Sequence, residues 1–182
     1  IGAAKFGFDY DYLNNTNSLS NEIAHEILDT AFNSNIKTID TAQGYGNSEQ
    51  VIGDYLRKRT IRNLNIITKV SQASNNIDIK SSLERLDVDC LYAVLIHVFS
   101  DFKKDNSIFY KLADYKEKGL INKIGFSLYF PEELEYLIES KIKFDIIQVG
   151  YSIFDQRFKE YFTDLKNMGV EIHTRSAFLH GL

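Results

Sequence analysis

Short apolar runs alternate with amphipathic stretches along most of this 182-residue chain. Apolar runs of about four to eight residues, bounded by polar or turn residues, are typical of strands that are buried on both faces. The runs predict seven strands, the first of them weakly defined: 3–8, 36–40, 64–69, 91–97, 121–127, 144–148 and 170–175.

The stretches between the predicted strands are amphipathic, with apolar residues recurring every three or four positions, which predicts helices. These helices are expected at 20–32, at 47–56, at 79–86, at 108–118, from 131 onward and at 158–168. Pro131 suits a first helical position, and Gly119 and Gly169 suit positions just after a helix end. Because strands and helices alternate strictly, we expect an α/β fold built on a parallel sheet.

Polar side chains stand where three successive strands end. Asp40, Lys69 and His97 are separated by 29 and 28 residues, close to one strand–helix unit each, and Tyr45 follows on the loop after Asp40. Neighbouring parallel strands lie about 4.8 Å apart, so residues at equivalent ends converge. The spacing therefore predicts one pocket that holds an acid, a tyrosine, a lysine and a histidine.

Each of these residues taken singly also has a structural explanation. Asp40 could cap a turn on which Tyr45 packs, Lys69 could reach solvent from the end of a buried strand, and His97 could be a core histidine bonded to backbone. Four polar groups at one end of a sheet are not how a core is filled, so the joint pattern favours chemistry. Asp40 is expected to contact Lys69 and keep it charged. The lysine would then favour the tyrosinate form of Tyr45, which makes a proton donor for a carbonyl oxygen.

Composition and charge narrow the class of protein. Residues 1–182 are expected to form one domain, with 44% hydrophobic residues, a net charge of −4 and a pI near 5.6. No basic face recurs, which argues against a nucleic-acid partner, and no apolar run of about 18 residues predicts a membrane span. The single cysteine, Cys90, excludes an intrachain disulfide and is expected to be a buried small hydrophobe. We therefore expect a cytoplasmic protein.

Several short motifs recur in order along the chain and carry a family resemblance. They are Asp40-Thr41-Ala42, Tyr45-Gly46, Ser48-Glu49, Ile67-Thr68-Lys69-Val70, Ser82-Leu83-Glu84-Arg85-Leu86, Leu95-Ile96-His97, Ile124-Gly125-Phe126-Ser127, Gln148 and Arg175-Ser176-Ala177-Phe178-Leu179. Over essentially its whole length the sequence resembles the aldo-keto reductases, and 127–129 with 154–158 resemble a bacterial branch. The resemblance implies a (β/α)8 TIM barrel and a catalytic tetrad of Asp40, Tyr45, Lys69 and His97, all four present.

The resemblance also implies the cofactor NADP(H) and residues that bind it. In the family, a Ser-Asn pair and a Gln hold the nicotinamide carboxamide; here Ser127 and Gln148 match, but Leu128 replaces the Asn. A tyrosine often stacks on the nicotinamide, and Arg175 stands in its place, where a guanidinium plane could also stack. The remaining cofactor-binding residues implied by the match follow at the start of the pyrophosphate channel: Ser176, Phe178 and Leu179.

The chain is shorter than the family pattern. About seven βα units are present, so the predicted fold is an incomplete barrel that lacks the eighth unit and the basic residues for the 2′-phosphate. A barrel that is not closed leaves strand edges unpaired. The chain also starts with Ile1. We therefore expect it to be a piece of a longer protein.

The function expected from these features is reduction of a small-molecule aldehyde or ketone, with hydride from NADPH and a proton from Tyr45. One alternative is a Schiff-base lyase that uses Lys69 as its nucleophile, although Asp40 should keep that lysine protonated. Another is a non-catalytic or regulatory barrel that binds a cofactor or a partner. No metal site is expected, since neither His-x-His nor His-Glu-x-x-His occurs.

Overall fold

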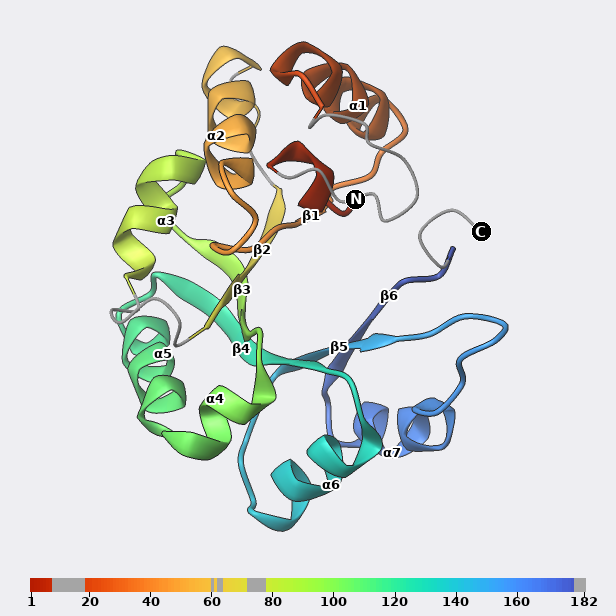
Figure 1. The fold of residues 1–182 in the computed structure, drawn as a ribbon. Helices are drawn as coiled ribbons and strands as arrows, with labels where there is room; N and C mark the ends of the chain where they lie inside the picture. The colour runs from red at the N-terminus through yellow and green to blue at the C-terminus, as the bar shows by residue number, and fades with distance from the viewer. Residues whose placement is uncertain (8–18, 60, 62–63, 72–77, 179–182) are drawn as a thin grey trace.

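A computed structural model describes residues 1–7, 19–59, 61, 64–71 and 78–178. Six parallel strands pair in chain order, each with the next, in one curled sheet (Figure 1). The strands are β1 Thr38–Asp40, β2 Asn65–Val70, β3 Leu91–Ile96, β4 Ile121–Leu128, β5 Ile146–Gly150 and β6 Glu171–Arg175. This topology confirms the predicted parallel α/β fold and has the form of an open part of a (β/α)8 barrel.

Helices cover the outer, convex face of the sheet (Figure 1). They are η1 Ala4–Phe6, α1 Asn21–Asn33, α2 Ser48–Arg59, α3 Ile79–Leu86, α4 Phe99–Lys104, α5 Ser107–Glu117, α6 Pro131–Glu139, η2 Lys159–Tyr161 and α7 Phe162–Asn167. Local capping explains several of the starts: Ser20 accepts from the Ile23 amide at α1, and Asp78 accepts from the Lys80 and Ser81 amides at α3. Pro131 occupies the first turn of α6, as predicted.

The main core lies between the sheet and its helices. It includes aromatic rings that pack around Phe126 of β4, and the rings of Phe109 and Phe126 stack with centroids 5.5 Å apart. The concave face has a smaller apolar cluster of Ile67, Ala93, Leu95 and Ile146. Alternation along each strand therefore sends one set of side chains to the helices and the other to the barrel interior, where the polar strand-end residues also point.

The prediction for the first strand, at 3–8, is wrong. Residues 4–6 form the 3₁₀ helix η1, residue 8 lies outside the described residues, and the strand pairing is reduced to one bridge between Gly2 and Asp40. The Ala3 amide donates to the Asp40 carbonyl and the Asp40 amide to the Ile1 carbonyl, so the chain does run along β1, but before the predicted position. The described residues therefore contain six strands and this bridge, where seven strands were expected.

Three smaller expectations also differ. Helix α4 was not predicted, because six residues are too few to show a helical period. The helix expected at 158–168 is divided into η2 and α7. Cys90 is only partly buried, and its thiol lies 3.5 Å from the Leu91 carbonyl and 3.4 Å from Asn122 Oδ1, so the prediction of a buried small hydrophobe is wrong. In the described part of the chain, no helix is long and apolar enough to cross a bilayer.

Candidate active site

Lys69 is a fully buried lysine at the centre of the polar cluster. Strand β2 places it on the concave face, where it is 1% exposed. Its Nζ donates to Asp40 Oδ2 at 2.7 Å and to the Thr41 carbonyl at 2.9 Å. The predicted contact between Asp40 and Lys69 is therefore confirmed, and the ammonium is compensated by one carboxylate and one carbonyl.

Tyr45 and His97 face the same ammonium from two other elements. Lys69 Nζ lies 5.0 Å from the centroid of the Tyr45 ring, and the rings of Tyr45 and His97 meet edge to face at 82° with centroids 5.6 Å apart. Backbone bonds fix the loop that carries Tyr45, since its amide donates to the Ala42 carbonyl and its carbonyl accepts from the Ser48 amide. The structure thus brings all four predicted tetrad residues together.

Burial shifts the pKa values of two of these groups. It lowers the pKa of Lys69, an effect that the Asp40 carboxylate opposes but does not cancel. Burial also lowers the pKa of His97 to about 4, helped by the positive charges of Lys69 and Arg175. His97 is therefore a neutral imidazole at neutral pH and has no imidazolium proton to give.

Gln148 connects the cluster to strand β5, on the other side of the concave face. Its Nε2 donates to Asp40 Oδ1 at 2.9 Å, which joins β5 to β1 across the concave face. Its Oε1 is buried and has no hydrogen-bond partner in the described part of the chain. Ser127 of β4 pairs in register with Gln148 and is also buried. An unpaired buried acceptor beside a buried hydroxyl is the kind of feature that a bound polar group would satisfy.

Arg175, at the end of β6, lies above Gln148 on the concave face. Its Nη2 donates to the Leu128 carbonyl at 3.1 Å, and its guanidinium carbon lies 4.0 Å from the centroid of the Tyr129 ring. Its Nε is buried and finds no partner among the described residues. Arg175 therefore points toward the site with its Nε–H unpaired among the described residues, while Leu128 turns its side chain into the outer core.

The last three predicted cofactor residues are less well placed. Ser176 has a φ of 60°, a left-handed conformation that is uncommon for a residue with a side chain, and its side chain is exposed. Phe178 is 82% exposed, and Leu179 lies outside the described residues. Their expected place along a pyrophosphate channel stays a prediction.

The sequence also matches a known protein family. A model of the aldo/keto reductase family matches residues 1–182. The chain belongs to this family. No curated protein sequence matches it.

Solved bacterial aldo-keto reductases share its fold. A protein of Pseudomonas aeruginosa that carries this name provisionally is 26% identical, with a TM-score of 0.79, and the match covers 96% of this chain and 71% of that one. The aldo-keto reductase AKR11C1 from Bacillus halodurans, in its holo form, is 24% identical with a TM-score of 0.79, over 100% and 62% of the two chains. An aldo-keto reductase from Klebsiella pneumoniae in complex with NADPH is 18% identical with a TM-score of 0.70, over 85% and 57%. The chain therefore spans between 57% and 71% of the length of these reductases, consistent with an incomplete (β/α)8 barrel.

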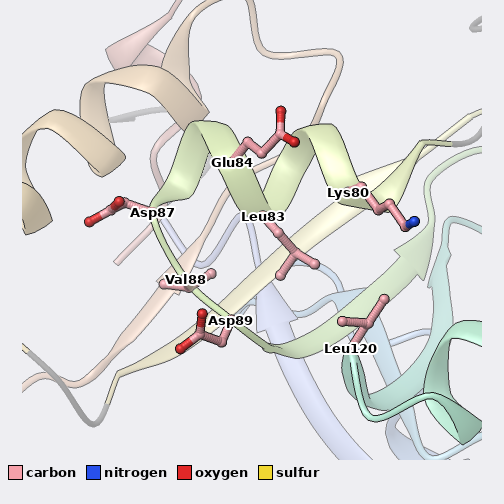
Figure 2. A pocket seen from close by; sticks show the side chains of 7 residues that line it. All are labelled: Lys80, Leu83, Glu84, Asp87, Val88, Asp89 and Leu120. Carbon is pink, nitrogen blue, oxygen red and sulfur yellow. The ribbon is translucent and has the colours of Figure 1, made fainter.

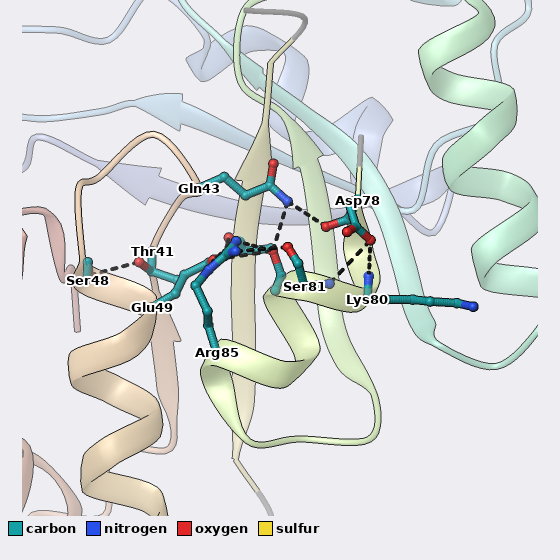
Figure 3. A network of polar contacts seen from close by, with 10 residues as sticks. Thr41, Gln43, Ser48, Glu49, Asp78, Lys80, Ser81 and Arg85 are labelled. Atoms are coloured by element: carbon teal, nitrogen blue, oxygen red, sulfur yellow. Dashed lines mark hydrogen bonds and ion pairs between the residues drawn. The ribbon is translucent and has the colours of Figure 1, made fainter. Parts of the chain in front are cut away.

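A second polar network lies behind the candidate site and supports it. Glu49 of α2 is 2% exposed, accepts from Thr68 Oγ1 at 2.6 Å and binds Arg85 of α3 through two nitrogens at 2.6 and 2.9 Å (Figure 3). Gln43, two residues before Tyr45, donates to Ser82 Oγ at 2.8 Å. The network therefore fixes the tyrosine loop between α2, β2 and α3. The sequence contained these residues as motifs, but no local pattern assigned them this role.

A surface cavity of about 620 Å³ lies away from this site. It lies beside α3 at the opposite end of the sheet, since residues 87–89 precede β3 and Leu120 precedes β4 (Figure 2). Its lining residues are Lys80, Leu83, Glu84, Asp87, Val88, Asp89 and Leu120. Three of these residues are acidic, and none of them belongs to the tetrad.

Proposed function

We propose that the protein is an NADP(H)-dependent carbonyl reductase in which Tyr45 is the proton donor and Asp40, Lys69 and His97 assist it. The observation that carries this proposal is the buried Lys69 ammonium, bonded to Asp40 and facing the Tyr45 ring. A cation held so near a phenol favours loss of the phenol proton, and it acts strongly because the site is shielded from water. The substrate is a small aldehyde or ketone.

Tyr45 and His97 are the two candidates for the proton donor, and their environments distinguish them. With a pKa of about 4, His97 is neutral at neutral pH and suits a hydrogen bond to the reacting oxygen. Tyr45 then donates the proton that the oxygen needs as the carbonyl carbon receives hydride. Asp40 holds Lys69 in place, and Gln148 in turn holds Asp40.

The residues around the tetrad suit a nicotinamide cofactor. Gln148 Oε1 and Arg175 Nε are both buried without a partner in the described part of the chain, and Ser127 lies beside them. One acceptor, one donor and one hydroxyl match the polar atoms of a carboxamide. NADPH, when bound there, would supply hydride from C4 of its nicotinamide.

The test is an assay of NADPH oxidation by the complete natural polypeptide over a panel of small and sugar-derived aldehydes and ketones. We expect turnover of at least one carbonyl compound and stoichiometric formation of its alcohol. Tight NADPH binding without turnover of any carbonyl would instead favour a regulatory barrel. Absence of NADPH binding would refute the proposal.

One observation favours a second candidate, a Schiff-base lyase. Burial lowers the pKa of Lys69, which increases the fraction of free amine available to attack a carbonyl carbon. Two hydrogen bonds hold its Nζ against Asp40 and Thr41, however, and an amine fixed in this way is a poor nucleophile. Borohydride reduction in the presence of an aldehyde substrate, followed by peptide mass spectrometry, separates the two. A covalent adduct on Lys69 would support the lyase.

A further inference from the structure

Arg175 and Leu128 are the two places where the site departs from the pattern of its family, and the structure links them. Leu128 is fully buried and packs into the outer core, so its side chain cannot take part on the concave face. Its backbone carbonyl, however, accepts from Arg175 Nη2 at 3.1 Å. Leu128 on β4 has no amide side chain, but its backbone carbonyl positions Arg175 on β6, two strands away.

Arg175 is held so that its Nε–H has a fixed direction. One nitrogen bonds to the Leu128 carbonyl, and the guanidinium plane lies over the Tyr129 ring at 4.0 Å. A guanidinium is planar and rigid, so these two contacts also fix Nε. Nε is buried and unpartnered within the described residues, although buried N–H groups of charged side chains are nearly always bonded.

Gln148 provides the complementary atom on the neighbouring strand. Asp40 Oδ1 can only accept a hydrogen bond when ionised, so the Gln148 nitrogen faces it and Oε1 is the atom left free. Arg175 pairs in register with Gly150, two residues beyond Gln148, so both side chains lie on the same face of adjacent strands. A buried donor, Arg175 Nε, and a buried acceptor, Gln148 Oε1, therefore stand on adjacent strands, and neither has a hydrogen-bond partner among the described residues.

We propose that Arg175 Nε donates to the carbonyl oxygen of the nicotinamide carboxamide while Gln148 Oε1 accepts from its amino group. Arg175 thereby replaces the amide side chain that is missing at Leu128 and is a specificity-determining residue for the cofactor. This inference rests on the proposed NADP(H)-dependent function. An arginine is compatible with the site because Asp155 lies near Arg175 and offsets its positive charge.

The test measures dissociation constants for three ligands by fluorescence or calorimetry, using the complete natural polypeptide and its variants. The ligands are NADPH, its thionicotinamide analogue, whose sulfur is a weaker acceptor than oxygen, and 2′-phospho-ADP-ribose, which has no nicotinamide. Arg175→Met should weaken NADPH binding about tenfold or more, the scale of a charge-assisted hydrogen bond. It should weaken binding of the thio analogue much less and leave 2′-phospho-ADP-ribose unchanged.

Two further variants keep the inference falsifiable. Arg175→Lys retains the charge but not the Nε donor, so it should lose NADPH affinity as Arg175→Met does. Arg157→Met removes a neighbouring arginine that bonds to Asp155 and the Tyr129 carbonyl, and it should leave all three ligands unaffected. If Arg175→Met is unstable, Arg175→Lys and the wild-type preference for NADPH over its thio analogue still test the contact.

The possible results separate this inference from the proposed function. Equal losses for NADPH and its thio analogue, full recovery in Arg175→Lys, or weaker binding of 2′-phospho-ADP-ribose would each show that Arg175 acts through charge or phosphate, and would overturn the inference alone. An unchanged NADPH affinity in Arg175→Met would do the same. Failure of the wild-type protein to bind NADPH would overturn the inference and the proposed function together.

Discussion

Tyr45 is the residue on which the proposed proton transfer depends. Tyr45→Phe keeps the ring that meets Lys69 and His97 but removes the hydroxyl. We expect the turnover number to fall by about 10² or more, the usual scale for loss of a general acid, and the dissociation constant of NADPH to stay the same. Steady-state kinetics and a binding titration provide the two measurements. Turnover close to the parental rate would show that another group is the acid.

His97 gives a pH prediction with a definite sign. Its pKa falls from the ordinary 6.5 to about 4 in the folded protein, so between these two values the unfolded chain takes up a proton that the folded chain does not. The contribution of His97 to stability is therefore present above pH 6.5 and is lost as the pH falls toward 4. In the NMR spectrum of the cofactor-free protein, its ring resonance should stay at the neutral position from pH 8 to pH 5.

Two variants control this measurement. His97→Gln identifies the resonance among the histidines of the chain. Arg175→Met should move the His97 titration to higher pH, because it removes one of the positive charges that oppose protonation. A wild-type midpoint near 6.5 would mean that His97 is solvated, which disagrees with its burial here.

The sequence predicted part of this site and missed the rest for a physical reason. Asp40, Lys69 and His97 end successive strands, so a repeat of 28–29 residues was enough to place them together. The bond from Gln148 to Asp40 joins the first and fifth strands, and only the curling of the sheet brings these together. The unpaired Arg175 Nε likewise depends on a rotamer that no sequence pattern specifies.

At the scale of the elements, α2 and α3 pack with their backbones in direct contact. A Cβ added to Gly53 would lie 1.8 Å from the Arg85 carbonyl oxygen, so α3 could not keep its position. Gly53→Ala should lower the free energy of unfolding by about 1–3 kcal/mol, the range for overpacked sites, and should separate Arg85 from Glu49. Urea denaturation measures the loss.

Gly2→Ala is the matched control, because a Cβ at Gly2 meets no atom within 4 Å. Its free energy of unfolding should stay within a few tenths of a kcal/mol of the parent, which is ordinary for surface substitutions. Similar stabilities for Gly53→Ala and Gly2→Ala would show that the two helices can separate without loss.

Local chemistry decided which elements could be predicted. The bounds of α3 were predicted at 79–86 and observed at Ile79–Leu86, where Asp78 caps the start and Asp87 ends the helix in a left-handed conformation. The strand expected at 3–8 does not form, because residues 4–6 adopt the helix η1 and the pairing with β1 falls on Gly2. Short elements such as α4 depend on packing, here of Phe99 and Phe102 against Phe126.

At the scale of the whole molecule, the sheet has two ends that do not meet. Within the described residues, β6 pairs only with β5, and the outer side of β1 pairs only through Gly2. Exposed strand edges pair readily with other chains. The reductases that share this fold have chains of which these 182 residues match 57–71%, so their remaining residues are available to cover such edges.

We therefore expect residues 1–182, expressed alone, to self-associate and to bind NADPH weakly compared with the complete natural polypeptide. The open edges favour association, and Ser127, Gln148 and Arg175 lie at the nicotinamide end of the proposed site, so none of the described residues is assigned to the charged 2′-phosphate. Sedimentation velocity and a fluorescence titration of NADPH, carried out side by side on both polypeptides, check the two effects. A monodisperse 182-residue chain that binds NADPH as tightly as the complete polypeptide would show that six strands already form a self-sufficient cofactor site.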